Sequence, residues 1–183
     1  MNTRQLTELI LSFLIVVVIA SVLMIKLTPF GAATSPDSIS YLEAAQNIRA
    51  GNGVVLTNYR IDADNQYVPL TVWPPLYPIV LSLFTASGKL GVFAASQMAI
   101  ITLSISGLLM LVLLRQVVGN YLAVSATLLF LIASPILTVF TYAWTESLFI
   151  PLLLFSCWCS LRCIETSYTK QVKKQAIYLF LLA

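Results

Sequence analysis

Two carboxylic acids stand where chemistry is possible in a chain with few charges. Asp37 comes a few residues after an apolar run long enough to cross a membrane, and Glu146 comes directly before another such run. A carboxylate can act as a general base, and two together can hold a divalent metal ion. Acids at a membrane boundary often mark a functional site. These two residues are therefore the first candidates for catalysis.

Each acid also has a purely structural explanation. Ser35 can cap a helix that has Pro36 at its first position, which places Asp37 in the first turn, where the helix dipole favours a carboxylate. Glu146 follows Thr145 at the start of an apolar helix in the same way. Such an acid stabilises a helix by about 0.3–1 kcal/mol without any catalytic role. The location of both acids at one membrane boundary is what favours a function.

The composition assigns the chain to the membrane proteins. Of its 183 residues, 59% are hydrophobic and 9% are charged, and the mean hydropathy is +0.92. So few charges cannot cover the surface of a water-soluble protein of this length. The predicted fold is all-α, with polytopic transmembrane helices and an external loop that carries two interfacial helices.

Apolar runs predict the order of the segments, because about 17–25 apolar residues cross a bilayer. Residues 1–28 contain the first transmembrane helix, whose apolar run over 9–25 is too long for a typical cleaved signal peptide. Residues 29–89 form an external loop with the interfacial helices and the candidate active site. Residues 165–183 form a cytoplasmic loop and the start of a truncated fifth helix. Residues 90–164 hold transmembrane helices two to four, over 90–114, 121–140 and 147–161.

Basic residues predict the orientation, because Lys and Arg are enriched in cytoplasmic loops. With a cytoplasmic N-terminus, six basic and two acidic residues lie inside, against four basic and five acidic residues outside. This distribution places Asp37 and Glu146 on the external face of a multi-pass protein of the cell membrane.

The external loop contains two stretches that predict interfacial helices. The first, over 36–49, has an apolar side, and Gly51 just beyond it is a typical helix end. The second is VWPPLYPIVLSLF, residues 72–84, in which Pro74 and Pro75 can open a helix and Trp73 suits a water–lipid boundary. The apolar side of the first helix comprises Ile39, Leu42, Ala45 and Ile48.

Several classes of site are excluded by what the sequence lacks. There is no histidine, which removes Ser-His-Asp catalysis and His-ligated metals. No glycine-rich nucleotide-binding motif is present, and the scattered basic residues predict no nucleic-acid partner. The three cysteines fall within the fourth span without the paired spacing of a metal site, which favours apolar packing: they are Cys157, Cys159 and Cys163.

Three motifs in order carry a resemblance to a known family. They are PDSISYLEAA after the first span, WPPLYPIVLSLF before the second and TESLFIPLLL at the fourth. In this order the chain resembles, over residues 9–165, the multi-spanning GT-C glycosyltransferases. It is most similar to the bacterial family 39-like branch related to protein O-mannosyltransferases and the lipid A aminoarabinose transferase. The resemblance implies transfer of a sugar from a polyprenyl-phosphate donor to a lipid, glycan or protein acceptor on the external face.

The resemblance also implies roles for individual residues. It implies a catalytic role for Asp37 and a pocket-building, catalytic role for Glu146, and Pro74 and Pro75 would shape the pocket wall. Many members have two adjacent acids where this chain has Ser38 after Asp37. Which acid performs which step therefore stays open. A divalent metal ion is the one cofactor considered, with Asp37 and Glu146 as its ligands, and whether it is required also stays open.

The chemistry of sugar transfer suggests further substrate-binding residues. A base, assigned here to Asp37, removes the proton of the acceptor, and a cation stabilises the leaving phosphate. That cation is either the metal ion or a basic side chain of the external loop. The candidates for binding substrate are Tyr41, Trp73, Arg49, Arg60 and Lys89.

A non-enzymatic membrane protein is the alternative, such as a portion of a transporter or an assembly factor. It predicts charged or helix-breaking residues in the middle of spans, as in discontinuous transporter helices. The spans contain only Pro135 and Pro151 of this kind, both expected near external ends. The glycosyltransferase interpretation is therefore favoured, while the sugar, the acceptor, the metal requirement and the oligomeric state stay open.

Overall fold

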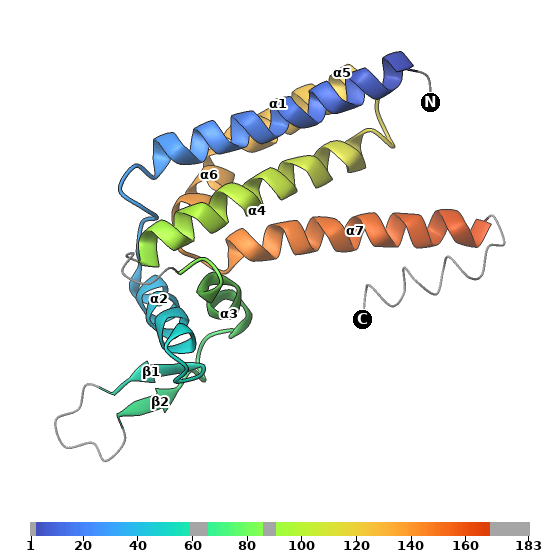
Figure 1. The fold of residues 1–183 in the computed structure, drawn as a ribbon. Helices are drawn as coiled ribbons and strands as arrows, with labels where there is room; N and C mark the ends of the chain where they lie inside the picture. The colour runs from blue at the N-terminus through green and yellow to red at the C-terminus, as the bar shows by residue number, and fades with distance from the viewer. Residues whose placement is uncertain (1–2, 59–65, 86–90, 169–183) are drawn as a thin grey trace.

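Three long apolar helices dominate the part of the chain that the structure describes. The structure, a computed structural model, describes residues 3–58, 66–85 and 91–168. The helices α1 (Thr3–Leu27), α4 (Gly91–Leu114) and α7 (Glu146–Tyr168) are each long and apolar enough to cross a membrane. They coincide with the first, second and fourth spans predicted from the sequence. In Figure 1 they run alongside one another, with α4 between the other two.

The third predicted span is broken in the structure. The sequence predicted one continuous helix over 121–140, but α5 (Asn120–Ile132) and α6 (Ser134–Thr141) are separated by a bend of 54°. Ala133, between them, has an extended backbone. Pro135 lies in the first turn of α6. A proline has no N–H to donate to the preceding turn, and its ring would clash with a carbonyl of that turn, so α5 cannot continue through it. The two helices together are apolar enough to count as a fourth, bent span.

Small residues allow the helices of the bundle to approach closely. Gly107 of α4 faces both α1 and α5, and a Cβ atom there would lie 2.7 Å from Cγ1 of Val16 and 3.1 Å from Cδ2 of Leu131. Both neighbours are fully buried in the main apolar core. Such close backbone approach at small residues is typical of helix packing in membranes. Gly107 therefore sets the spacing of α1, α4 and α5.

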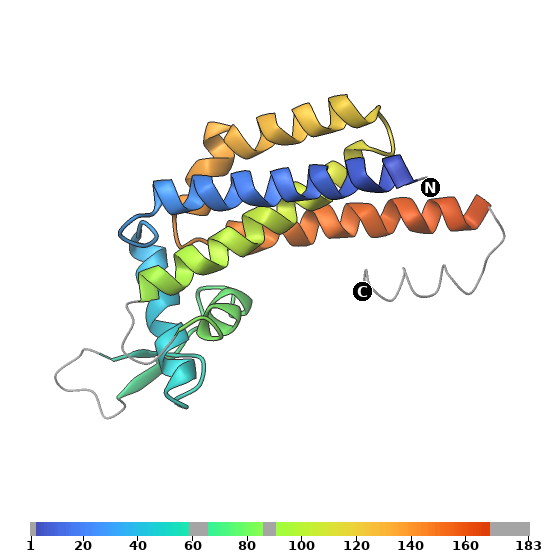
Figure 2. The same cartoon turned by 45° about the horizontal axis from the view of Figure 1, so that its top comes forward.

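A second, smaller unit lies at one end of the bundle. It comprises α2 (Pro36–Arg49), β1 (Val55–Thr57), β2 (Tyr67–Pro69) and α3 (Leu76–Ser82). Both views show this unit at the end where α1 stops and where α4 and α7 begin (Figures 1 and 2). The tertiary structure therefore gathers the segment after α1 and the start of α7 at the same end of the molecule.

The two strands form a small hairpin that the all-α prediction lacked. They pair antiparallel, with Leu56 opposite Val68. Two side chains of α2 form hydrogen bonds with the backbone of β1. Nδ2 of Asn47 donates to the carbonyl of Val55 at 2.9 Å, and the amide of Thr57 donates to Oε1 of Glu43 at 2.8 Å. Glu43 therefore has a structural role on α2.

The start of α2 is confirmed as the sequence predicted it. Ser35 is the N-cap, and its Oγ accepts a hydrogen bond from the amide of Ser38 at 3.3 Å. Pro36 is the first helical residue, and Asp37 lies in the first turn. The backbone position of Asp37 is therefore set by a capped helix end.

The end of α2 is also confirmed, in the form of a Schellman motif. Gly51 has a φ of +84°, and its amide donates to the carbonyl of Ile48 at 3.1 Å. The amide of Asn52 donates to the carbonyl of Asn47 at 2.9 Å. This pattern requires a left-handed residue after the helix, which is why glycine stands there.

Replacing Gly51 by alanine is expected to destabilise the protein by about 1 kcal/mol, because a Cβ atom disfavours the left-handed conformation. No atom lies within 4 Å of the position that this Cβ would occupy, so the loss comes from the backbone alone. Thermal unfolding in detergent would measure it as a melting temperature lower by a few degrees. Gly119, with φ −62° and equally open space, provides the control variant Gly119→Ser. An unchanged melting temperature for Gly51→Ala would contradict the assignment of this motif.

The packed face of α2 combines apolar and polar residues. Of the apolar side identified from the sequence, Ala45 is fully buried and Ile39 is 59% exposed. The buried face also includes Tyr41 and two polar residues, Ser38 and Asn47. Hydrogen bonds offset the burial of these two polar side chains: Oγ of Ser38 bonds with Oγ of Ser35, and Nδ2 of Asn47 donates to the carbonyl of Val55.

Candidate functional site

The segment before α2 and the loop before α7 are joined by backbone hydrogen bonds. The amide of Ala33 donates to the carbonyl of Thr141 at 2.8 Å, and the amide of Ala143 donates to the carbonyl of Ala33 at 3.0 Å. These bonds form a short parallel bridge between Ala33 and Tyr142. The bridge brings together two regions that are distant in the sequence, each of which leads into a helix bearing one of the candidate acids.

An indole hydrogen bond adds a second connection between the same segments. Nε1 of Trp144 donates to Oγ of Ser35 at 2.8 Å. The ring of Trp144 stacks on that of Tyr142, with centroids 4.6 Å apart. Asp37 and Glu146 follow directly after these contacts, each in the first turn of its helix.

Both acids line one cavity, here called the acidic pocket. Its volume is about 440 Å³. Asp37 and Glu146 supply its charge, and no basic residue is among its lining residues, which all belong to the described part of the chain. The lining residues are Asp37, Tyr41, Val72, Trp73, Pro74, Trp144, Thr145 and Glu146.

Aromatic rings form a wall of the acidic pocket. Tyr41 packs edge-on against Trp73 at 6.0 Å and against Tyr77 at 5.2 Å. Burial raises the pKa of Tyr41, a hydrogen bond with the Thr145 side chain opposes the increase, and the nearby carboxylates add to it. Burial likewise raises the pKa of Tyr77 above its ordinary value. Tyr41, which lines the acidic pocket, and Tyr77, which packs against it, therefore both stay neutral at physiological pH and add no charge there.

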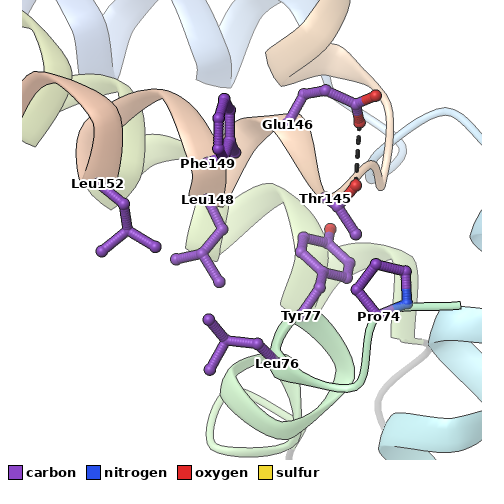
Figure 3. Close-up of a pocket in the computed structure, with 8 residues that line it drawn as sticks. All are labelled: Pro74, Leu76, Tyr77, Thr145, Glu146, Leu148, Phe149 and Leu152. Atoms are coloured by element: carbon purple, nitrogen blue, oxygen red, sulfur yellow. Dashed lines mark hydrogen bonds between the residues drawn. The ribbon is translucent and has the colours of Figure 1, made fainter. Parts of the chain in front are cut away.

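A second cavity, the apolar pocket, adjoins the first. It has a volume of about 350 Å³ and lies between α3 and α7 (Figure 3). Pro74, Thr145 and Glu146 line both cavities. Figure 3 shows the Thr145 hydroxyl donating to Oε2 of Glu146, at 3.2 Å, at the rim of this pocket. The remaining lining residues are Leu76, Tyr77, Leu148, Phe149 and Leu152.

The structure gathers most of the predicted site residues that it describes. Asp37, Glu146, Tyr41, Trp73 and Pro74 all line the acidic pocket. Of the other four predicted residues, two are described and do not line the pocket, and two are not described. Pro75 is the N-cap of α3, Arg49 is exposed at the opposite end of α2, and Arg60 and Lys89 lie outside the described residues.

Sequence reasoning missed Trp144 and Val72 as lining residues and had assigned Thr145 only a capping role. Trp144 stands two positions before Glu146, in the turn that the sequence placed at the same boundary. Trp73 was selected as a boundary aromatic, and the same criterion applied to this turn would have selected Trp144. Val72 carries no such signal, because its role depends on the path of the chain into α3.

The donor atoms of the acidic pocket fit a divalent cation that shares its coordination with a ligand. Among the described residues, no group of three or more histidine, cysteine, aspartate or glutamate side chains could enclose a metal ion. Two carboxylates nevertheless line the pocket, and Mg²⁺ is commonly held by one or two carboxylates together with water and substrate phosphate. Asp37 and Glu146 could hold an ion of this kind.

The acidic pocket has the surface that a polyhydroxylated ligand requires. Carboxylates accept hydrogen bonds from hydroxyl groups, and aromatic rings cover apolar C–H faces. Both kinds of group converge here from α2, from the segment that leads into α3 and from the start of α7 with the loop before it. Comparison of the chain with protein-family models, with curated proteins and with solved structures finds no match.

Proposed function

We propose that the protein is a membrane glycosyltransferase that moves a sugar from a polyprenyl-phosphate donor to a lipid, glycan or protein acceptor. One observation supports this proposal above all: the acidic pocket and the apolar pocket share Pro74, Thr145 and Glu146. A single ligand with a polar head and an apolar chain would suit two adjoining cavities of opposite character. A polyprenyl-phosphate sugar is such a ligand, with its sugar against the acids and its chain between α3 and α7.

The proposed reaction needs a base and a means to stabilise the leaving phosphate. Asp37 accepts the proton of the acceptor hydroxyl as that oxygen bonds to the anomeric carbon of the sugar. The bond from this carbon to the phosphate oxygen breaks, and polyprenyl phosphate leaves with the electron pair. Glu146 faces the same pocket and binds sugar hydroxyls or a metal ion. The sugar contacts Tyr41 and Trp73.

A divalent metal ion is the proposed source of positive charge at the leaving phosphate. Asp37 and Glu146 would hold it, and its charge would stabilise the phosphate oxygen as the bond breaks. Arg49 is exposed and does not line the acidic pocket, which weakens its candidacy for the same task. Arg60 and Lys89 keep the roles that the sequence suggested for them.

The broken span of α5 and α6 is a feature that the non-enzymatic alternative predicts. In transporters, the ends of discontinuous helices themselves hold the substrate. Here the residues that line the two adjoining cavities come from α2, α3, α7 and the segments leading into them, and none comes from α5 or α6. The break therefore does not favour transport over sugar transfer.

The proposal includes a location: a multi-pass protein of the cell membrane with a cytoplasmic N-terminus and the acidic pocket on the external face. The bias of basic residues supports this orientation. It places the pocket where a donor exposed on the outer leaflet reaches it.

Photolabelling of the complete protein tests the proposed donor site. Polyprenyl-phosphate hexoses with a photoreactive group on the prenyl chain would be tested one by one, with the corresponding photoreactive prenyl alcohol as the control. We expect the label on peptides of α3 and α7, displaced by excess unmodified donor and absent with the alcohol. Labelling confined to α1 or α5, or labelling that excess donor does not displace, would contradict the proposal.

A further inference from the structure

We propose that the hydrogen bond between Ser35 and Trp144 is a positioning contact that holds Asp37 and Glu146 over one pocket. The geometric part of this inference is independent of the reaction. Its consequence for turnover rests on the proposed function. Neither Ser35 nor Trp144 was among the candidate residues of the sequence.

The two segments are joined just before the two acids. Ala33 is bridged in parallel to Tyr142, and Oγ of Ser35 accepts from Nε1 of Trp144. Asp37 comes two residues after Ser35, in the first turn of α2, and Glu146 comes two residues after Trp144, at the start of α7. Both acids line one pocket. The bridge and the indole bond therefore lie immediately before the acid pair in both segments.

Ser35 links this connection to the orientation of α2. Its Oγ accepts both from the amide of Ser38, as the helix cap, and from the indole of Trp144. Oγ of Ser35 also lies 3.0 Å from Oγ of Ser38. Asp37 is in the first turn of this capped helix. A movement of the Trp144 loop is thereby transmitted to the end of α2 that bears the acid.

Trp144 is held from the other side by its own neighbours. Its ring stacks on Tyr142 with an interplanar angle of 20°, and the backbone on either side of Tyr142 is bonded to Ala33. Its side chain therefore approaches Ser35 from a constrained direction. Glu146, two residues later, begins α7.

The packing of the helices explains why a separate connection is needed. α2 packs mainly against α3, while α7 packs mainly against α4. The main contacts of each acid-bearing helix are therefore with a partner other than the second acid-bearing helix. The joined segments before α2 and α7 supply the direct connection between the two acids.

Four variants separate this role from general stability. Trp144→Phe removes the donor N–H and keeps an aromatic ring, and Ser35→Gly removes the acceptor while glycine remains an acceptable N-cap. Ser35→Thr keeps the hydroxyl and is the rescue variant. Tyr142→Phe keeps the stacked ring, leaves the indole bond intact and is the matched control.

Cross-linking measures the geometry without any substrate. Cysteines would replace Asp37 and Glu146 in the complete protein after its native cysteines are changed to alanine, and bis-maleimides of increasing length would link the pair. We expect the linking rate with the shortest effective reagent to fall at least fivefold with Trp144→Phe and with Ser35→Gly. It should stay within twofold of the parent with Ser35→Thr and with Tyr142→Phe. Parental rates in both loss variants would overturn the positioning role.

A transfer assay with both acids intact then distinguishes the two proposals. Ser35 does not line the acidic pocket, so Ser35→Gly is expected to lower kcat about tenfold with the KM for donor within twofold, and Ser35→Thr to restore kcat. Slower cross-linking in a protein that transfers no sugar would support the positioning contact and reject the glycosyltransferase. Slower cross-linking with an unchanged kcat would reject the role of this contact in turnover.

Discussion

Replacing Asp37 by asparagine is expected to lower the turnover of sugar transfer about 1000-fold, because the amide cannot accept the proton of the acceptor hydroxyl. Asparagine has nearly the same size, and losing the charge from the first turn of α2 costs at most about 1 kcal/mol, so the fold should be preserved. The measurement is the initial rate of sugar transfer from polyprenyl-phosphate donor by the complete protein in membranes. Protein yield should remain that of the parent, and the melting temperature should fall by no more than a few degrees.

The matched control for this variant is Glu43→Gln on the same helix. Glu43 is an acid of α2 that lies outside the acidic pocket and accepts a hydrogen bond from the amide of Thr57. The glutamine oxygen can accept the same bond, so transfer should remain close to the parental rate. Equal losses in the two variants would indicate a general effect of removing an acid from α2. Parental turnover in Asp37→Asn would remove Asp37 from the role of base.

The largest effect on stability is expected at Gly107, far from the pocket. Replacement by valine is expected to destabilise the protein by about 3 kcal/mol, since the added atoms overfill a closely packed helix contact. Even the Cβ atom would lie 2.7 Å from Cγ1 of Val16 and 3.1 Å from Cδ2 of Leu131. The loss would be measured as the melting temperature of the protein in detergent, with Gly107→Ala showing a smaller decrease in the same direction.

Gly119→Ser provides the control for a glycine without close neighbours. Gly119 is the N-cap of α5, no atom lies within 4 Å of the position that a Cβ atom would occupy there, and serine is a favourable N-cap residue. The melting temperature of this variant should match or slightly exceed that of the parent. A Gly107→Val protein as stable as the parent would show that α1 and α5 do not approach α4 as closely as described.

Local signals made the main helices and the ends of α2 predictable. The apolar runs of α1, α4 and α7 can be recognised as candidate membrane spans from their length alone, because the bilayer sets a minimum length for a span. Ser35, Pro36 and Gly51 act on the backbone within a few residues of their own positions, so their effects can be read without tertiary information.

Other features could not be predicted, either because two local signals opposed each other or because they depend on residues distant in the sequence. Pro135 was expected within a span, and the bend of 54° at this point arises because its ring excludes a regular preceding turn. The face of α2 that packs inside the protein could not be predicted from periodicity, because the hairpin and the aromatic residues around Tyr41 cover it. Asn47 is polar but buried there, and its side chain donates a hydrogen bond to the carbonyl of Val55. The spacing of apolar residues along α2 gives no sign of this bond.

The sequence by itself determined that the chain has long apolar helices. It also determined that Asp37 lies in the first turn of a helix that follows one of them, and that Glu146 begins another of them. Only the tertiary structure decided that the two acids share a pocket. That outcome depends on the bridge between Ala33 and Tyr142 and on the bond from Trp144 to Ser35. Hydrogen bonds between segments this far apart depend on how the whole bundle packs, and neither segment carries that information alone.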